Sequence, residues 1–426
     1  PTQASPRAEL PAPPDTAAGD TLPRQPLVEL APPPPRTLVN PAHVVEHLFA
    51  AVDNSVKPIV RNKKIEKLPV LDYDVALLPF EELLPRDVVA LKETPGALED
   101  FLGQVYAGLS SSDATSHHVL VYLQALSLDT DVANIVVNSS LLSLLVKAMR
   151  RTKVPHAKFN YARLMGILVR HATIIADDVA KSGIDVALCE TLRNADPTLA
   201  KEAMASLGEL LFYIASRDEG PPPWSLPSSA LTLVVGHIKD PAGAPIAAAY
   251  AVQTLHNIGV TSAPFFAPLA TLDLALALVR MLASASSTLT VAIANTLARL
   301  CRVSFTRAVE AQVSAVEASS SAGAPGTVPA HLAPRLLEKA GVNWLIGGLS
   351  SGATKVCAAM LNILVLGLLT APPRAQLAVI STRGLLPTLL SALDHKSTDV
   401  RGKALAGLAV VASVSREGLL MCLELR

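Results

Sequence analysis

A chain of 426 residues that is 50% hydrophobic and carries 36 basic and 36 acidic side chains is not a disordered protein. A net charge of zero provides no long-range field toward nucleic acid or an anionic membrane, so we expect neither as a partner. Because aromatic residues make up only 4% and the apolar half is mainly Ala, Leu and Val, which pack helices side by side, we expect an all-helical protein.

The first segment, 1–40, holds eleven of the 33 prolines and ends close to the run APPPP. Proline lacks the backbone N–H that a helix or strand needs, so such a segment builds no hydrogen-bonded ladder and buries no core. We interpret it as a disordered, proline-rich linker that could dock an aromatic groove on a partner. It shows no basic stretch followed by an apolar run, and we therefore expect no secretory signal.

Residues 41–110 combine a short helix candidate, HVVEHLFAAV, a basic stretch and a proline-punctuated piece, LPVLDYDVALLPFEELLP. The basic stretch NSVKPIVRNKKIEK sets five cations against a single acid, Glu66. Two interpretations stay open: a junction that hands over from a preceding domain, or a solvated linker whose lysines avoid the core. The candidate protein-binding residues of this stretch are Lys57, Arg61, Lys63, Lys64 and Lys67.

From about Val119 to the end, apolar residues recur at three- and four-residue spacing in blocks separated by Gly, Pro, Asp and Ser. The unit from Ser182, SGIDVALCETLRNADPTLAKEAMASLGEL, aligns with the unit from Arg383, RGLLPTLLSALDHKSTDVRGKALAGLAVV. In both units a Gly begins a helix, a polar turn closes it, and a longer helix follows. A period of roughly 40 to 47 residues is typical of armadillo or HEAT repeats, so we predict an α-solenoid.

Looser copies of the unit begin at Leu141, Ala230, Leu272 and Gly341. The array is interrupted by a loop, RDEGPPPWSLPSS, and by a low-complexity insertion, ASSSAGAPGTVPAHLAP. Because each repeat touches only its neighbours, both interruptions can project from the surface. The predicted organisation is a linker at 1–40, a junction at 41–110, repeats at 111–308, an insertion at 309–334 and final repeats at 335–426.

No motif indicates catalysis. HVVEH matches a zinc-binding pattern, but three fixed residues in five recur by chance and no deep site is in view. GLSSG, with Ser350 at its centre, matches a nucleophile elbow, but it falls in a turn between two helices and follows no strand. The lysine, catalytic-loop and D-F-G motifs of protein kinases do not occur in this chain. We expect no catalytic residue, metal or cofactor.

The cysteines lie inside apolar helical stretches and form no C-x-x-C pair, so we expect buried thiols in a reducing compartment. The most apolar window, FFAPLATLDLALALVRMLA, is interrupted by Asp273 and Arg280, and we expect a buried solenoid helix there rather than a membrane span. The four cysteines are Cys189, Cys301, Cys357 and Cys422.

Several stretches in a fixed order resemble one family. GELLFYIA, LVYLQALSLDTDVANIVVNSSLLSLLVKAMR and ILVRHATIIADDVA are similar to the helical C-terminal region of the Unc-51-like (fourth member)/RUNKEL pseudokinase family, a branch near the Fused kinases. VKPIVRNKKIEK resembles the segment that these proteins carry just after the catalytic domain, and LEKAGVNWLIGGLS resembles part of their last repeats. The resemblance covers roughly 54–426.

In that family a kinase-like domain precedes this region and is degenerate in many members, so the resemblance implies a non-catalytic scaffold. It also implies a cytoplasmic, cytoskeletal location on microtubule structures such as the axoneme and central apparatus of motile cilia. Implied partners are Fused-type kinases or armadillo-repeat ciliary proteins, with any microtubule contact indirect because the chain is neutral. Two alternatives stay open: the regulatory arm of an active serine/threonine kinase, and an unrelated armadillo adaptor that holds a peptide in its groove.

An armadillo-type solenoid binds extended peptides or helical rods on the concave side lined by its longer helices. Asn257, in TLHNIG, resembles the armadillo asparagine that pairs with a ligand backbone. In the longer helix of the Ser182 unit we expect an inner apolar stripe of Leu199, Ala203, Met204, Leu207 and Leu211. The candidate binding residues on the repeats are Lys201, Glu202 and Glu209, which we expect to face outward, and Gln253, Asn257, Arg401 and Lys403.

Overall fold

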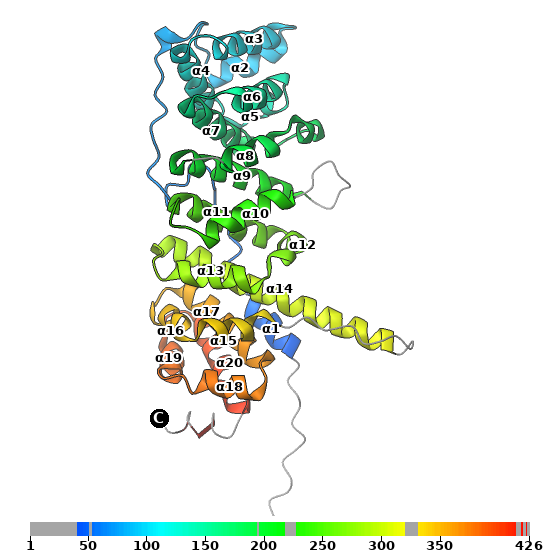
Figure 1. Ribbon diagram of the computed structural model, residues 1–426, viewed down its shortest axis with the longest axis vertical. Coiled ribbons are helices and arrows are strands. Elements are labelled where there is room, and N and C mark those ends of the chain that lie inside the picture. The colour runs from blue at the N-terminus through cyan, green and yellow to red at the C-terminus, as the bar shows by residue number, and fades with distance from the viewer. Residues whose placement is uncertain are drawn as a thin grey trace, which may run out of the picture. The chain divides into compact units, whose positions relative to one another are not determined.

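The computed structural model describes residues 41–50, 53–193, 196–217, 227–319, 331–414, 419–420 and 423. Residues 41–426 form one compact unit, in which helices follow one another in stacked layers (Figure 1). The predicted linker at 1–40, the centre of the loop RDEGPPPWSLPSS and Cys422 lie outside the described residues. Within the described residues the regular structure is entirely helical, which confirms the all-α prediction.

The longer helices form one continuous row, in which each packs against the next along the chain. Several begin with proline in the first turn, where the missing N–H would have no partner within the helix. Because each helix contacts its neighbours in sequence, the row has the nearest-neighbour packing of a solenoid. The row consists of α4 (Asp113–Leu126), α7 (Pro155–His171), α9 (Pro197–Ser216), α11 (Pro245–Thr261), α14 (Ser287–Ser319), α17 (Thr354–Thr370) and α20 (Thr398–Val414).

The shorter helices form a second row that packs against the first. This row consists of α3 (Ala97–Leu109), α5 (Thr130–Val137), α6 (Ser140–Arg151), α8 (Ile184–Arg193), α10 (Ser228–Lys239), α12 (Ala263–Phe266), α13 (Leu272–Leu282), α15 (Leu332–Ala340), α16 (Asn343–Ser350), α18 (Pro373–Ile380) and α19 (Leu385–Ser391). Short 3₁₀ turns complete it: η1 (Val75–Leu77), η2 (Leu91–Glu93), η3 (Asp177–Ser182), η4 (Ala267–Leu269) and η5 (Ala392–Asp394).

The two aligned repeat units fold as predicted, into α8–α9 and α19–α20. Gly183 and Gly384 precede the first helix of each unit with φ of 75° and 92°, a backbone region that side chains with a Cβ rarely adopt. Asp196 caps α9 by accepting hydrogen bonds from the backbone N–H groups of the helix's first turn. The predicted inner stripe of α9 is buried, as are its counterparts Val400 and Ala404 in α20, but Leu405, which aligns with Met204, is 62% exposed.

A single hydrophobic core runs through the repeats and supplies most of the stabilisation, at about 25 cal/mol per Å² of apolar surface removed from water. Cys189, Cys301 and Cys357 are free and buried in it, as predicted. Burial raises the pKa of Cys189 to about 11 and that of Cys301 to about 12, so these thiols stay protonated at neutral pH. They contribute to packing rather than to chemistry.

The chain before the repeats is folded onto them. The helix α1 (Pro41–Ala50) packs against α17 near the other end of the sequence, with Leu48 and Phe49 buried. From Asp53 onward the chain is mostly non-helical until α2 (Pro85–Ala90), which contacts α5. Figure 1 shows this blue connection passing from α1 along the stacked helices to α2. The basic stretch of the sequence lies within it.

Candidate functional site: a backbone-binding groove on the long helices

The groove segment, which we define as Asp53–Glu66, lies across the row of long helices. Its contacts run in the opposite direction to the repeats: Asp53 meets Lys355 of α17, the Lys57 backbone meets Asn257 of α11, and Glu209 of α9 follows. Cavities of about 410 Å³ and 540 Å³ adjoin it at Asp53 and Asn54. The segment therefore occupies the face on which an armadillo solenoid holds its ligands.

Asn257 forms hydrogen bonds with both backbone groups of one residue in this segment, Lys57. Its Nδ2 donates to the carbonyl of Lys57 at 2.7 Å, and its Oδ1 accepts from the N–H of Lys57 at 3.3 Å. Gln253, one turn earlier on α11, donates to the same Oδ1 at 2.9 Å and so fixes the orientation of the amide. Two side chains buried on a helix thus form an amide–backbone pair with the chain's own segment, while binding of a separate ligand at Asn257 stays a prediction.

Glu209 binds the next part of the segment. The N–H groups of Ile59 and Val60 both donate to its Oε1, at 2.7 and 2.9 Å, and Arg170 of α7 donates to the carbonyl of Val60. Burial raises the pKa of Glu209, while the two N–H donors and the nearby Arg170 oppose that rise. Two backbone donors that would otherwise be buried without partners are satisfied by one carboxylate.

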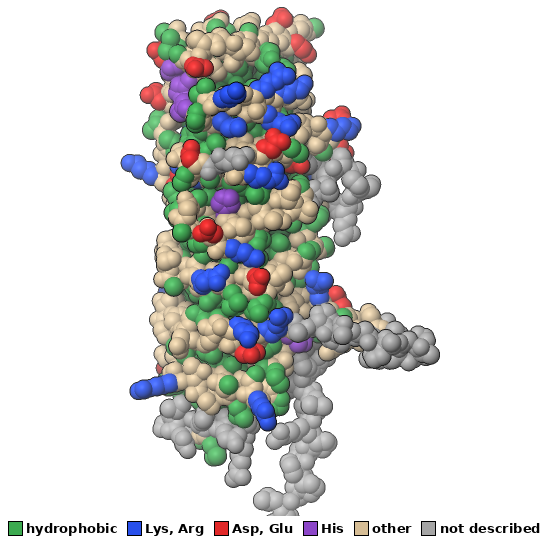
Figure 2. Space-filling view, viewed as in Figure 1, with side chains coloured by type: hydrophobic (Ala, Val, Ile, Leu, Met, Phe, Trp, Pro, Cys, Tyr) green, Lys and Arg blue, Asp and Glu red, His purple; other side chains and the backbone are tan. Residues whose placement is uncertain are grey.

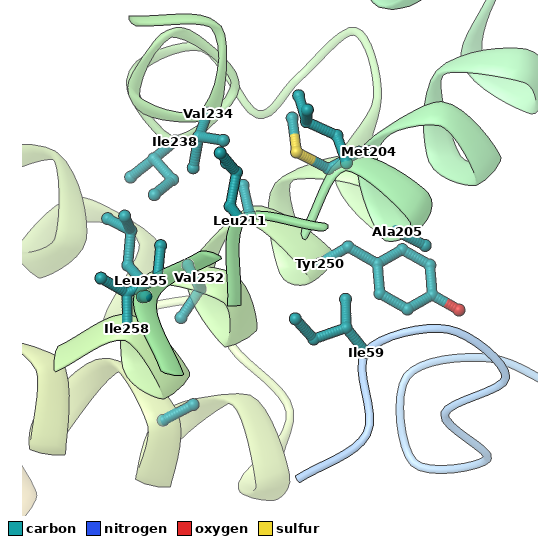
Figure 3. Close-up of a cluster of buried hydrophobic side chains, with 14 of the residues drawn as sticks. Ile59, Met204, Ala205, Leu211, Val234, Ile238, Tyr250, Val252, Leu255 and Ile258 are labelled. Atoms are coloured by element: carbon teal, nitrogen blue, oxygen red, sulfur yellow. The ribbon is translucent and has the colours of Figure 1, made fainter. Parts of the chain in front are cut away.

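The apolar pair Ile59 and Val60 is fully buried, at 0% and 1% exposure. Figure 3 shows Ile59 pointing from the groove segment into the apolar cluster, beside the ring of Tyr250. A Cβ added at Gly208 would lie 3.1 Å from Ile59 Cγ2, and one at Gly166 would lie 2.5 Å from Val60 Cγ2. The nearest neighbours of the added atoms would be closer still, Thr254 Oγ1 at Gly208 and Ser206 Oγ at Gly166, so the two glycines allow close packing of the long helices as well as of the isoleucine and valine side chains.

Replacing Gly166 with alanine is expected to lower the free energy of unfolding by about 1–3 kcal/mol, because the added methyl group overlaps Val60 and Ser206. The matched control is Gly103→Ala in α3, where an added Cβ has no neighbour within 4 Å and helix propensity favours alanine by about 0.5–1 kcal/mol. Urea unfolding of both variants measures the difference. Equal stabilities would contradict the close contact at Gly166.

Each end of the groove segment carries an acid that pairs with a lysine on a long helix. Asp53 accepts from Lys355 at 2.7 Å, and Glu66 accepts from Lys201 at 2.5 Å and from the Tyr250 hydroxyl at 2.8 Å. Burial alone would raise the pKa of Asp53, but its hydrogen bonds to Lys355 and Ser55 outweigh that effect and lower it. The Asp53 carboxylate therefore holds its end of the segment in the charged state at neutral pH.

Two further side chains contact the backbone at the start of the groove segment. Arg299 of α14 donates to the carbonyl of Asp53 and to the Asn54 side chain, both at 2.8 Å. The His256 Nε2 lies 3.4 Å from the carbonyl of Ser55. Burial first, and then the charge of Arg299, lower the pKa of His256 to about 4. This imidazole is neutral in the folded protein at neutral pH.

Acidification is expected to loosen this end of the groove segment. A histidine with a folded pKa of about 4 and an ordinary value of 6.5 contributes stability that is complete above pH 6.5 and is lost as the pH falls toward 4. The full loss is about 3 kcal/mol at 1.36 kcal/mol per pKa unit. Unfolding curves of the wild type and His256→Gln between pH 7 and pH 4 test this. Curves that fall in parallel would exclude His256 as the titrating group.

A buried ion pair lies beside the groove segment. Arg163 of α7 donates to Glu202 of α9 at 2.8 Å, with side-chain exposures of 9% and 7%.

Arg61 bends the groove segment with a φ of 54°, and Asn62 closes the turn by donating to the Pro58 carbonyl at 2.8 Å. The turn reverses the chain so that Glu66 returns to α9 and α11.

The structure buries some of the binding residues predicted from the sequence and exposes others. The expectation that Glu202 and Glu209 face outward is wrong, because both are buried at 6% and 4% exposure and one of them binds the groove segment. Lys201 is partly buried by its pair with Glu66. Lys63, Lys64 and Lys67 are exposed, whereas Lys57 and Arg61 are half-buried.

The two candidates on α20, Arg401 and Lys403, make their hydrogen bonds and ion pairs with residues of the last repeat. Lys403 is buried and pairs with Asp399 at 3.1 Å, and Arg401 donates to the carbonyls of His395 and Lys396. These hydrogen bonds and ion pairs are internal to the last repeat, but Lys403 and Asp399 also line the 410 Å³ cavity that adjoins Asp53 of the groove segment. The structure brings together Lys57, Arg61, Lys201, Glu202, Glu209, Gln253 and Asn257. Lys403 reaches the site only through the cavity at Asp53, and Arg401 does not line that cavity.

Sequence reasoning missed the role of Arg170, His256, Arg299 and Lys355, which contact the groove segment across intervals of 110 to 302 residues. The signal that could have identified the site is the pair of glycines, Gly166 and Gly208, in the interior of two long helices. A conspicuous glycine in a buried helix indicates close approach of another backbone or side chain.

The described residues offer no metal-binding group of three or more His, Cys, Asp or Glu side chains. In that same part of the chain, no single helix combines the length and apolar content needed to cross a membrane, although three bent helix pairs meet both criteria together. The array of helix pairs is not a kinase fold. The fold and the site together define an armadillo/HEAT-type α-solenoid whose row of long helices binds the backbone of an extended segment.

Comparison with known proteins identifies its relatives. Over 399 residues the chain is 27% identical to the serine/threonine-protein kinase RUNKEL of Arabidopsis thaliana, covering 89% of this chain and 27% of the relative. Over 393 residues it is 23% identical to the serine/threonine-protein kinase ULK4 of Mus musculus, covering 89% and 28%. The chain is a homologue of these two kinases, which confirms the resemblance seen in the sequence, and it spans only about a quarter of either one. No family model matches the chain.

Solved structures support the fold. An engineered protein from the Northeast Structural Genomics Consortium superposes with a TM-score of 0.52 at 18% identity, over 80% of this chain and 76% of the other. A chain from work on a phosphorylation switch that controls the interaction between cadherin and β-catenin superposes with a TM-score of 0.51 at 15% identity, over 84% and 64%. At such identities the likeness concerns the fold alone.

Proposed function

We propose that this chain is the non-catalytic interaction arm of a larger kinase-like protein, a scaffold that holds protein segments on its row of long helices. The observation that carries the proposal is the set of buried polar side chains that bind the backbone of the groove segment, above all Asn257 and Glu209. Side chains that form hydrogen bonds with a peptide backbone, rather than with a reacting group of a substrate, are suited to binding a peptide and not to catalysing a reaction.

The relatives support the link to a kinase. Both are described as serine/threonine-protein kinases, and the chain matches about a quarter of each. We propose that the kinase-like portion is degenerate and that the solenoid supplies the main function, as the family resemblance implies. The second candidate, a regulatory arm of an active kinase, is favoured by the relatives' descriptions as kinases. An unrelated adaptor is not supported by this homology.

We further propose that the protein acts on a microtubule structure, such as a ciliary axoneme, through partner proteins rather than by direct contact. Its support is the resemblance, together with the net charge of zero. On the face shown in Figure 2, basic side chains gather over the upper part of the molecule, and lower down basic and acidic side chains are interspersed with apolar and neutral ones. In the groove, the acids Asp53 and Glu66 pair with Lys355 and Lys201, so these two lysines are matched by acids of the chain itself.

Affinity purification of the parent protein tests the scaffold proposal. A form lacking residues 41–426 should lose the proteins that co-purify with it, whereas a form altered only in the ATP site of its kinase-like portion should keep them. Retention of all partners without the solenoid would refute a scaffold role. A solenoid deletion that changes substrate phosphorylation but not partner content would favour the regulatory arm instead.

Co-sedimentation of residues 41–426 with stabilised microtubules across a salt series tests direct contact. We expect no pelleting. Salt-sensitive pelleting that disappears when Lys63, Lys64 and Lys67 are changed to glutamate would show direct electrostatic binding and contradict the indirect arrangement. These three lysines are suited to the test because they are exposed, so their reversal leaves the buried contacts of the groove segment in place.

A further inference from the structure

We propose that the groove segment is an exchangeable ligand carried by the chain itself: it closes the groove until a partner with the same chemistry displaces it. The inference rests on the proposed function, because it names the kind of partner that the interaction arm takes. The partner is a protein segment with an acidic residue six positions ahead of two adjacent β-branched residues, as in Asp53, Ile59 and Val60.

The first step of the argument is that the groove recognises this segment as a peptide. Asn257, Glu209 and Arg170 bind backbone groups, which every peptide presents. None of these bonds requires that the ligand be joined to the repeats. A segment from another protein, lying in the same direction, would meet the same donors and acceptors.

The second step is that specificity comes from two places. Ile59 and Val60 are fully buried and pack close to Gly208 and Gly166. Lys355 binds the acid at the start of the segment at 2.7 Å. A polar or charged pair in place of the isoleucine and valine would be buried without partners, so the groove discriminates against such sequences.

The third step is that the groove segment can leave without dismantling the repeats. The long helices α7, α9, α11 and α14 pack on one another and on the short-helix row through contacts that do not involve the segment. Beyond Glu66 the chain becomes accessible, with Lys67 exposed and Val70 86% exposed. Release would leave Glu209 and Asn257 open to a new backbone rather than unfold their helices.

Limited cleavage of the folded protein provides the test. A protease site inserted between Pro69 and Val70, where the chain is exposed, is cut after folding, so the groove segment stays bound but is no longer tied to the repeats on that side. The probe is a fluorescein-labelled synthetic peptide of residues 53–68. The matched control peptide carries Ile59→Asp and Val60→Asp. Fluorescence polarisation measures binding of each peptide to cut and uncut chain.

We expect the cut chain to bind the probe at least about tenfold more tightly than the uncut chain, because the cut removes one of the segment's two tethers, leaves only the one to α1, and so lowers the effective concentration of the segment. The control peptide should not bind either form. A full-length variant with Ile59→Asp and Val60→Asp in its own segment should bind the probe like the cut chain, and adding Glu209→Ala to it should abolish binding. Circular dichroism checks that the variants are folded; if they are not, the cut wild-type chain decides.

Failure to bind the probe by both the cut chain and a folded Ile59→Asp/Val60→Asp variant would overturn the inference, as would equal binding by cut and uncut chain. Binding of the control peptide as tightly as the probe would also overturn it, because the apolar pair would then have no role. These failures differ from failure of the proposed function. The purified protein could fail to bind the probe while the parent protein still needs residues 41–426 to retain its partners. That result would leave the proposed scaffold function standing and refute only the exchange of the groove segment.

Discussion

Replacing Glu209 with alanine is expected to lower the free energy of unfolding by about 2–5 kcal/mol, because two buried N–H groups lose their acceptor at once. The same change should speed hydrogen exchange of the Ile59 and Val60 amides more than that of the amides within α9. Urea unfolding followed by peptide-level hydrogen exchange measures both effects. Glu209→Gln, which keeps an acceptor oxygen, should recover part of the loss.

The control for this change is Glu190→Ala, which removes an exposed acid on α8 that pairs with Arg150. Exposed pairs are worth about 0–1 kcal/mol, so this variant should remain close to the wild type. If Glu209→Ala and Glu190→Ala were equally stable, the contact between α9 and the groove segment would not hold the segment in solution.

Breaking the buried pair is the second large effect. Glu202→Ala leaves the Arg163 guanidinium buried without its carboxylate, and removal of one partner from such a pair costs about 3–5 kcal/mol. Thermal and urea unfolding should both show the loss. Replacing both residues, with Arg163→Met and Glu202→Leu, should restore much of the stability, because a well-packed apolar pair replaces the unpaired charge.

The exposed pair Arg150–Glu190 again provides the comparison, since its N–O distance of 2.9 Å is close to the 2.8 Å of the buried pair. Similar geometry with different burial isolates the cost of desolvation. A double-mutant cycle that gives the same coupling energy for both pairs would contradict this account.

The sequence predicted the repeat architecture well, for a local reason. Gly183 and Gly384 begin matching helices, and Leu188, Leu389 and their neighbours bury one face at helical spacing. Each of these signals depends on residues within one repeat. Packing between adjacent repeats then follows from the same apolar faces, which is why the solenoid could be predicted without any relative.

The site was harder to predict because it is made by residues far apart in the chain. The Glu209 carboxylate and Ile59 are separated by 150 residues, and the spacing of α9 alone places Glu209 on a polar face that suggests exposure. No residue near Glu209 in the sequence indicates that another segment covers that face. The domain divisions and the partner role of the predicted binding residues stay predictions, although α14 continues as a helix to Ser319, well into the span assigned to the insertion.

The direction of the groove segment has a consequence for synthesis. Residues of the groove segment meet helices that are made much later: Asp53 pairs with Lys355 across 302 residues, whereas the contacts within and between neighbouring repeats are local. A growing chain can stack its repeats one by one as they leave the ribosome, but its early segment has no complete binding surface until α14 and α17 have formed. The groove segment can therefore dock only after helices that follow it by up to 302 residues have formed, and until then an apolar isoleucine–valine pair remains uncovered.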